Sequence, residues 1–375
     1  MSPYISFPGT LTPDWLTDVL HASSALPIGK VTHAQIQVTD AFNSHTSRLI
    51  VQYSPDAPTS LPTRLVLKRN TEADWAKDAG KEEVTFYRHV ASLSRRPPIY
   101  IPCLAAEYDE ASGNSYLLLQ DVSDTHEPPM TYERHLSIVD GVPTPAHINC
   151  VVDVLAQHHA LWWEHAHAGT NDLFTTGYWS RNAERLEMYL VRRKTSWANV
   201  LAQAGEWLPA EIHELYEDVL ANLPRYWQRY LRPRFESGAS LTLVHGDSYF
   251  SNFLCPKQID DDGAHAYMLD WQSPVFDVGG HDLANMCATF WMPEQRHEDQ
   301  REQSILRRYL AQLHAGGVAN YAWDDLLLDY RHGLIYWLLV PVQDANDGSP
   351  KDYWWPKMQC LVHAFREWGC EGLLA

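Results

Sequence analysis

The chain has 375 residues, 45% of them hydrophobic and 20% charged, which indicates a globular protein with room for two domains or lobes. Its formal net charge of −18 argues against sequence-independent nucleic-acid binding, which requires a cationic surface; the acidic surface favours either solubility or a cationic small substrate. No stretch reaches the roughly 20 apolar residues of a membrane helix, and residues 1–8 lack the basic and apolar segments of a secretory signal. Six scattered cysteines without a C-x-x-C pair predict reduced thiols, no zinc site and a cytoplasmic protein.

The N-terminal third has the pattern of a small antiparallel sheet with one internal helix. Helices are expected over 11–22, where Thr12 or Asp14 provides the cap, and over 72–94. Residues 40–47 are expected to form the loop between the first two strands. Alternating apolar residues predict strands over 36–39, 48–53, 64–68, 104–108 and 116–119.

The polar segment 120–129 is the best candidate for a lobe boundary, because the pattern beyond it becomes mainly helical. The strongest helical periodicity lies over 148–163, and further helices are expected over 180–230 and from 282 onward. The polar, proline-bearing segment 343–356 is expected to be a loop.

The stretch Val-His-Gly-Asp-Ser-Tyr-Phe-Ser-Asn at 244–252 carries the clearest chemical signal. Asp247 follows an apolar run, Asn252 lies in the same loop, and Asp270 ends a short apolar strand beyond an expected hairpin turn at 258–264. Alone, each of these side chains is explained by turn capping or by acceptance of backbone N–H groups. Together, in this order, they favour phosphoryl transfer: one carboxylate orients a hydroxyl group, and the other oxygens hold Mg²⁺ against nucleotide phosphates.

The pattern resembles the aminoglycoside phosphotransferase and choline kinase group of small-molecule kinases, including its ecdysteroid-kinase-like branch. The group's elements are matched here by His245-Gly-Asp…Asn252, by Leu269-Asp270 and by Asp282-Leu-Ala284. The match is specific over about 240–292. It implies an α+β, protein-kinase-like fold of two lobes: a nucleotide-binding lobe over 1–122, with a small antiparallel sheet and a hinge at about 119–122, and a larger, mainly helical lobe over 123–375.

Carried over by residue, the resemblance implies that Asp247 is the catalytic base. Asn252 and Asp270 would bind Mg²⁺ bridging the nucleotide phosphates. Asp282 would tie the catalytic loop through hydrogen bonds, and His245 would support that loop. The helical lobe would also carry the acceptor pocket.

The same resemblance implies a nucleotide site in the N-terminal lobe. Lys68 would contact the phosphates with Glu83 as its partner, Glu82 being the near competitor, and Val66 would pack on adenine. Backbone groups of Gln120 and Val122 would hydrogen-bond adenine. The loop 40–47 contains no glycine, so the hydroxyl groups of Ser44, Thr46 and Ser47 would contact the phosphates instead. Tyr249 stands where a protein kinase carries a lysine, which favours a small-molecule kinase.

Aromatic and polar residues toward the C-terminus are candidates for the acceptor pocket. An aromatic wall with nearby acids suits a quaternary ammonium group, and the same residues suit a flat apolar sterol or polyketide; packing in the helical core is the third interpretation. The candidates are Trp271, Gln272, Trp291, Tyr336, Gln343, Asp344, Trp354 and Trp355.

The sequence therefore predicts a phosphotransferase that uses ATP or GTP with Mg²⁺ and transfers the γ-phosphate directly to a hydroxyl group. The acceptor would be an aminoglycoside, a macrolide, a choline-like amino alcohol, a sterol-like compound or another hydroxylated metabolite. No nucleic-acid or membrane partner is expected, and the protein would be a monomer or homodimer. The alternatives are a nucleotide-binding pseudokinase or interaction module without turnover, and a metal-dependent hydrolase using Asp247 and Asp270.

Overall fold

The computed structural model describes residues 4–40, 44–94, 97–137, 140–177, 179–259 and 265–375. Its contacts group the chain into two compact units. Unit 1 contains the described residues up to Glu127, together with Pro256–Gln258 and Tyr267–Ser273. Unit 2 contains the described residues of the remainder. The lobe boundary predicted at residue 122 stays a prediction. The segment Tyr267–Ser273, which contains Asp270, belongs to unit 1 and not to the mainly helical unit 2.

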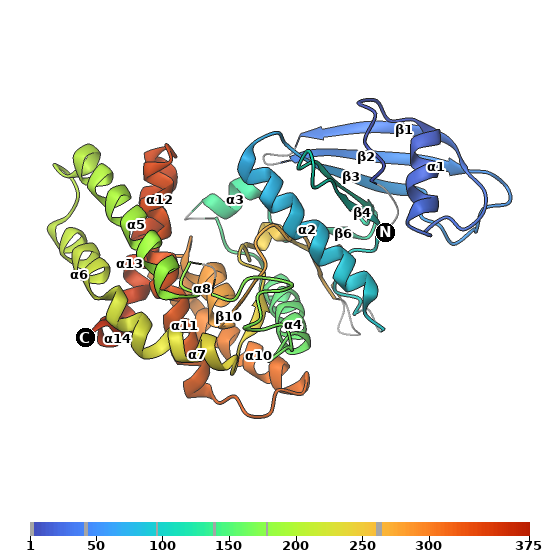
Figure 1. Cartoon of the computed structure of the whole chain (residues 1–375). Helices are drawn as coiled ribbons and strands as arrows, with labels where there is room; N and C mark the ends of the chain where they lie inside the picture. The colour runs from blue at the N-terminus through green and yellow to red at the C-terminus, as the bar shows by residue number, and fades with distance from the viewer. Residues whose placement is uncertain (1–3, 41–43, 95–96, 138–139, 178, 260–264) are drawn as a thin grey trace. The chain divides into compact units, whose positions relative to one another are not determined.

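Unit 1 is built on a five-stranded antiparallel sheet with the order β1-β2-β3-β5-β4 (Figure 1). All five predicted strands are present, and β1 and β2 are longer than expected. The strands are β1 Val31–Asp40, β2 Ser44–Tyr53, β3 Arg64–Asn70, β4 Cys103–Tyr108 and β5 Ser115–Gln120. The remaining elements of this part of the chain are α1 Pro13–Ala22, α2 Asp74–Ser92 and β6 His126–Glu127.

The two faces of this sheet have different partners, because successive side chains of a strand point to opposite sides. Helix α1 covers one face, where its Leu16 and Leu20 pack in one core cluster with Leu65 and Leu67 of β3. The Thr12 side chain caps α1 by accepting a hydrogen bond from the Trp15 N–H at 3.1 Å, as predicted. Helix α2 contacts β3, β4 and β5.

The predicted loop 40–47 is wrong in its second half, because Ser44 begins strand β2. The pairing of β2 with β3 continues to the end of β3, with Thr46 opposite Lys68 and Ser47 opposite Leu67. The backbone hydrogen bonds of this extended ladder outweigh the polar side chains that favoured a loop. Directly paired residues share a face. Ser47 therefore lies on the face of Leu67, opposite to that of Lys68.

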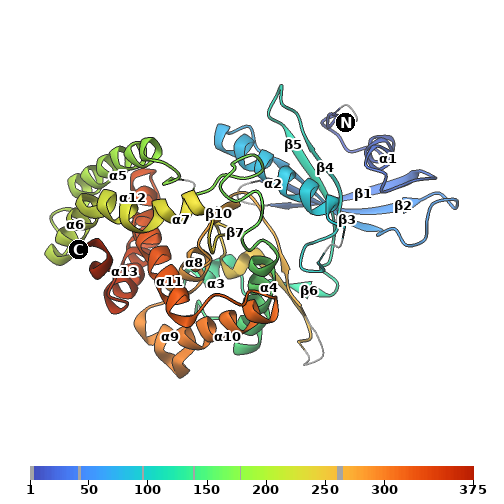
Figure 2. The ribbon, with the colours of Figure 1, turned by 60° about the horizontal axis from the view of Figure 1, so that its bottom comes forward.

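Unit 2 is mainly helical, and its helices pack in pairs: α8 on α11, α4 on α10 and α5 on α12 (Figures 1 and 2). A short antiparallel pair, β7 Thr242–Val244 with β10 Val275–Asp277, lies in this unit. The chain passes between the units around β8 Phe253–Pro256 and β9 Tyr267–Met268. The helices are α3 Tyr132–Leu136, α4 Pro145–Leu161, α5 Ala183–Ala204, α6 Ala210–Tyr226, α7 Arg232–Ser237, α8 Gly280–Ala288, α9 Pro293–His297, α10 Arg301–Ala315, α11 Trp323–Leu338, α12 Val340–Asn346, α13 Lys351–Glu367 and α14 Glu371–Leu374, with a π-helical turn at Trp227–Leu231 and 3-10 turns at Phe250–Asn252 and Glu298–Gln300.

Close packing of α8 on α11 depends on two glycines. A Cβ atom added to Gly280 would collide with the backbone of Asp329, and one added to Gly333 would collide with the Gly280 carbonyl oxygen. Backbone atoms cannot yield in the way that a flexible side chain can. These contacts position the N-terminal turn of α8, which carries Asp282.

Most of the segment 343–356 is helical, and the predicted loop is confined to residues 347–350 between α12 and α13. The segment contains the end of α12 and the start of α13, and Pro356 lies inside α13. Trp354, Lys357, Met358 and Leu361 are all buried at helical spacing. Burial of this face outweighs the hydrogen bond lost at the proline. The predicted hairpin turn at 258–264 falls largely outside the described residues.

Candidate functional site

Lys68 is the centre of an ionic cluster within unit 1. Its ammonium nitrogen lies 2.7 Å from a carboxylate oxygen of Glu83 and 2.5 Å from Oδ1 of Asp270. The three side chains come from β3, from α2 and from the turn after β9. Glu83, which is 4% exposed, is the partner of Lys68, and Glu82 is not part of this cluster.

Burial and charge oppose each other at this cluster. Burial alone would lower the pKa of Lys68, but the carboxylates of Asp270 and Glu83 outweigh it and raise the pKa. Burial raises the pKa of Glu83, against the attraction of Lys68. Asp270 has a φ of 65°, in the left-handed region that non-glycine residues rarely occupy. Strained backbone of this kind often marks functional positions.

A small pocket of unit 1 adjoins this cluster. Gly80 of α2 lies against Ser115, where an added Cβ atom would collide with the Ser115 hydroxyl group. The lining residues include Ser44, Lys68, Asn70, Gly80, Ser115 and Gln272. Ser44 therefore lines the same pocket as Lys68, whereas Ser47 faces the other side of the sheet. Gln272, predicted to line an acceptor pocket of the helical lobe, lines this pocket instead.

The predicted adenine contacts lie on or beside β3 and β5. Val66 is half-buried and precedes Lys68 by two residues, so both side chains share a face of β3. The backbone N–H of Gln120 donates to the Pro102 carbonyl oxygen at 2.9 Å, which restricts its predicted role to its own carbonyl group. The Val122 carbonyl oxygen accepts the His126 N–H at 2.9 Å.

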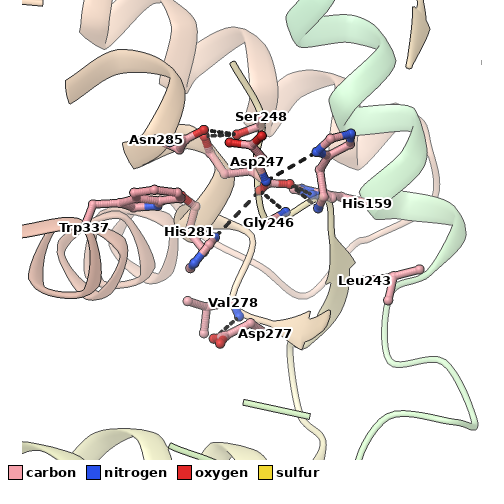
Figure 3. Close-up of polar contacts among 12 residues, drawn as sticks. His159, Leu243, Gly246, Asp247, Ser248, Asp277, Val278, His281, Asn285 and Trp337 are labelled. Atoms are coloured by element: carbon pink, nitrogen blue, oxygen red, sulfur yellow. Dashed lines mark hydrogen bonds and ion pairs between the residues drawn. The ribbon is translucent and has the colours of Figure 1, made fainter. Parts of the chain in front are cut away.

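In unit 2, residues 245–252 form a loop that directly follows β7; we call it the Asp247 loop (Figure 3). Asp282 of α8 is completely buried and accepts the N–H groups of His245 at 2.7 Å and Gly246 at 3.0 Å. Gly246 has a φ of 80°, which favours glycine at this position. The Ser248 hydroxyl group adds a hydrogen bond to the Asp282 carbonyl oxygen at 2.7 Å. Asp282 therefore ties the start of this loop to α8.

Two residues behind Asp282 were missed by sequence reasoning. His159 of α4 lies 3.1 Å from Asp282 through Nε2 and 2.8 Å from the Tyr309 hydroxyl group through Nδ1. All three side chains are buried. Burial would raise the pKa of Asp282, but the hydrogen bond from His159 and the nearby His281 ring outweigh it and hold the pKa well below its usual value. The available signal was a histidine on the apolar face of the helix predicted over 148–163.

Asp247 and Asn252 meet within their loop. The Asn252 amide nitrogen donates to the Asp247 carbonyl oxygen at 2.7 Å and to its carboxylate at 3.2 Å. The Asp247 N–H donates to Nδ1 of His245 at 3.3 Å, so His245 supports the loop from within. Because the amide nitrogen of Asn252 faces Asp247, its amide oxygen points away and is suited to bind a cation.

The predicted acceptor tryptophans Trp271 and Trp291 are core residues, and their assignment to a pocket wall is wrong. Both are 0% exposed. Trp271 stacks on Phe86 at 3.7 Å between ring centroids, inside unit 1. Trp291 stacks on Phe250 at 5.5 Å, and its indole N–H donates to the Gly141 carbonyl oxygen. Large aromatic rings next to a polar motif gain more from burial than from exposure.

The other acceptor candidates lie in unit 2. Trp354 is buried, and the half-buried Trp355 packs edge-on against Trp207. Tyr336 lies 4.4 Å from His281 between ring centroids. The remaining two are engaged by cations: Gln343 accepts a hydrogen bond from Arg193, and Asp344 forms an ion pair with Lys357 at 2.9 Å.

Two other features of the described ranges bear on function. No helix there has the length and hydrophobicity needed to cross a membrane. Nor do three or more His, Cys, Asp or Glu side chains of these ranges gather in a way that could hold a metal ion.

Two solved structures share the fold of this chain at low sequence identity. A choline kinase from Cryptosporidium parvum Iowa II matches with a TM-score of 0.55 and 12% identity, over 92% of this chain and 92% of its own. The GDP complex of a mutant aminoglycoside 2'-phosphotransferase-IIIa matches with a TM-score of 0.50 and 12% identity, over 96% and 98%. These matches confirm the predicted α+β, protein-kinase-like fold.

Comparison with curated proteins found no match. A family model, in contrast, covers residues 40–317, well over half of the chain and including Lys68, Asp247, Asn252 and Asp270. Its description is the ecdysteroid kinase-like family, which is the branch that the His-Gly-Asp motif predicted. The chain belongs to the ecdysteroid kinase-like family.

Proposed function

We propose that this chain is an ATP- and Mg²⁺-dependent phosphotransferase that moves the γ-phosphate to a hydroxyl group of a small molecule. The observation that carries the proposal is the Lys68 cluster, in which one ammonium group is held between Glu83 and Asp270. A lysine held by a helix glutamate, with a further carboxylate for metal binding, is the arrangement that phosphoryl transfer requires. Family membership and fold support the same class of reaction.

In this proposal unit 1 binds the nucleotide. Lys68 contacts the phosphates, and Glu83 orients Lys68. Ser44, which lines the same pocket as Lys68, contributes a hydroxyl group. Val66 packs on adenine, which hydrogen-bonds to the Gln120 carbonyl group and to the backbone of Val122. A buried lysine with two carboxylate partners stays charged, so it can neutralise phosphate oxygens over the whole physiological pH range.

Magnesium fits the residues that we assign to it. Asp270 offers a carboxylate whose side chain is 29% exposed, and Asn252 offers an amide oxygen turned away from Asp247. Oxygen ligands in small number suit Mg²⁺, which usually takes one or two protein ligands and fills its shell with phosphates and water. When bound, the ion would neutralise charge on the nucleotide phosphates. His245 and Asp282 would act only by holding the Asp247 loop.

Asp247 would orient the acceptor hydroxyl group and accept its proton. The acceptor oxygen forms a bond to the γ-phosphorus while the bond between that phosphorus and the bridging oxygen of ADP breaks. The proton passes to the Asp247 carboxylate, and ADP leaves with the electron pair. The loop supports this role, because its backbone is held by Asp282 while the Asp247 side chain stays partly exposed.

The testing experiment is a thermal-shift series with ATP, GTP and Mg²⁺, alone and combined, followed by ADP release over a panel of hydroxylated compounds. The panel includes aminoglycosides, macrolides, amino alcohols and sterol-like alcohols. Asp247→Asn is the inactive control, and Asp352→Asn, at an exposed position, is the matched control. Stabilisation by nucleotide with Mg²⁺, and ADP release for one acceptor class, is the expected result.

Two other outcomes would each contradict the proposal. Stabilisation by nucleotide without ADP release for any acceptor would favour a pseudokinase. Absence of nucleotide stabilisation, with metal-dependent hydrolysis instead, would favour a hydrolase that uses Asp247 and Asp270.

A further inference from the structure

Lys357 of α13 places a positive charge inside unit 2. Its side chain is 3% exposed, and its ammonium nitrogen lies 2.9 Å from Oδ2 of Asp344 on α12. Burial alone would lower the pKa of Lys357, but its surroundings raise it, so the group is charged at neutral pH. A buried ion pair is rarely the most stable choice between two packed helices, where apolar side chains of similar size do as well or better. The charge therefore calls for a functional explanation.

Three aromatic rings surround this ammonium group. The centroids of Tyr353, Phe290 and Tyr249 lie 5.3, 5.8 and 6.0 Å from the Lys357 nitrogen. Distances of about 6 Å or less allow a ring face to attract a cation. Several aromatic rings with one carboxylate are the set of groups that recognises organic ammonium ions. We call Tyr249, Phe290, Tyr353 and Asp344 the ammonium box.

A buried histidine also borders the box. His135 is 1% exposed, and its ring lies 4.9 Å from the rings of both Tyr249 and Phe290. Burial first, and then the charge of Lys357, lower the pKa of His135 to about 3, so this histidine is neutral at physiological pH. The positive charge in the box therefore comes from Lys357 and not from His135.

The box is continuous with the Asp247 loop. Tyr249 belongs to that loop and lies two residues after Asp247. Its hydroxyl group responds to charges on both sides: burial is the largest influence that raises the pKa of Tyr249, the charge of Lys357 lowers it, and Asp247 raises it. A ligand beside Asp247 would thus meet a wall whose cation-binding capacity is already used.

We propose that Lys357 is a specificity-determining residue that fills the ammonium box beside the Asp247 loop and excludes acceptors carrying their own ammonium group. The acceptor hydroxyl group would then belong to an uncharged or anionic compound. Asp344, which the sequence offered as a ligand for a cationic acceptor, serves Lys357 instead. The consequence for acceptors rests on the proposed phosphotransferase function, whereas occupation of the box does not.

The test is chemical rescue of Lys357→Ala, which removes Cγ, Cδ, Cε and Nζ. n-Propylammonium has the same heavy atoms and charge as the deleted group, and 1-propanol is its uncharged counterpart. We expect n-propylammonium to raise the melting temperature of Lys357→Ala saturably, by roughly 2–4 °C. 1-Propanol should have no such effect. Wild type and Lys351→Ala, which loses a lysine on an exposed position over Trp207, should not respond.

Absence of a response in Lys357→Ala, or an equal response in wild type, would overturn the proposal. If Lys357→Ala does not fold, the double variant Lys357→Ala with Asp344→Ala removes both charges of the ion pair. The aromatic rings of this double variant should still bind n-propylammonium, but more weakly. Absence of binding would again overturn the proposal. Neither measurement needs nucleotide, so failure here is distinguishable from failure of the phosphotransferase proposal. Once an acceptor is identified, Lys357→Ala should turn over its quaternary ammonium analogue and wild type should not.

Discussion

The Lys68 cluster of unit 1 and the Asp282 network of unit 2 use carboxylates in opposite ways. In the Lys68 cluster, the ammonium group of Lys68 donates to the carboxylates of Glu83 and Asp270 from two other segments, and the Asp270 side chain is 29% exposed. In the Asp282 network, a carboxylate with no exposed surface accepts two backbone N–H groups and a histidine.

The side chains of the Lys68 cluster can exchange their partners for a ligand, whereas Asp282 fixes the path of the backbone. The ionic contact of the partly exposed Asp270 side chain can be replaced by contacts to a phosphate or a metal ion at little loss, because charge still meets charge. A buried carboxylate that accepts backbone N–H groups has no such replacement, since those donors would be left unpaired. Unit 1 is therefore suited to bind a ligand, and the Asp282 network to hold a loop.

The largest expected effect is at Asp247, the side chain that the Asp282 network presents. Asp247→Asn should lower kcat by about 10²–10⁴-fold, the usual contribution of a positioned general base, while nucleotide affinity changes little. The measurement is ADP release with an identified acceptor, together with ATP titration. An unchanged kcat would remove Asp247 from the mechanism.

Breaking the network itself should destabilise the protein. Asp282→Ala leaves the N–H groups of His245 and Gly246 without their buried acceptor, which costs about 3–5 kcal/mol of unfolding free energy. Urea unfolding measures this change, with Asp352→Ala as the exposed control, expected within about 0.5 kcal/mol of wild type. A loss below 1 kcal/mol would show that the loop does not depend on Asp282.

A second buried carboxylate of unit 2 sharpens the comparison. Burial raises the pKa of Asp277 from 3.8 to about 6; Asp329 adds to the increase, while His281, the Val278 N–H and Arg234 oppose it. Asp282 is equally buried but has enough donors to lower its pKa. The hydrogen-bond donors and charges around each carboxylate, and not burial, decide the direction in which its pKa shifts.

Asp277 should make stability depend on pH. A carboxyl group with a raised pKa in the folded state contributes stability that is complete below pH 3.8 and is lost as the pH rises through about 6. The unfolding free energy of wild type minus that of Asp277→Asn should therefore fall by about 2.4 kcal/mol between pH 4 and pH 7. The difference is used because other groups, such as His332 with a pKa lowered to about 3, also titrate. A flat difference would contradict the pKa of Asp277.

The sequence predicted the fold because its strands alternate regularly and its His-Gly-Asp motif keeps the order and spacing of a known group. The family's pattern favoured Glu83 over Glu82 as the partner of Lys68, and the structure pairs Lys68 with Glu83. Neighbouring residues of a helix differ by about 100° in direction, so only one of the two can face Lys68. Ser44 and Ser47 were misplaced because a strand made of polar residues resembles a loop when its partner strand is not visible.

Burial was the property that the sequence could not supply. Trp271 and Trp291 were assigned to a pocket because of their place near the motif, yet both are core residues. His159 stood in a helix that was predicted correctly, but its contact with Asp282 joins segments far apart in the chain. Lys357 was passed over for a similar reason, since a lysine in a polar segment is expected to be exposed.

The smallest expected effect is at the Lys68 cluster, whose ionic contacts we expect a ligand to replace. Lys68→Met removes the cation that Glu83 and Asp270 share, so ATP affinity should fall about tenfold, equivalent to about 1.4 kcal/mol. The folded state should tolerate the change, because Glu83 can take up a proton, as its raised pKa already favours. Lys81→Met, on the exposed side of α2, is the matched control and should leave ATP affinity unchanged. Isothermal titration with and without Mg²⁺ gives both affinities. If Lys68→Met destabilises the protein but leaves the ATP affinity of the folded protein unchanged, the Lys68 cluster is structural, like the Asp282 network.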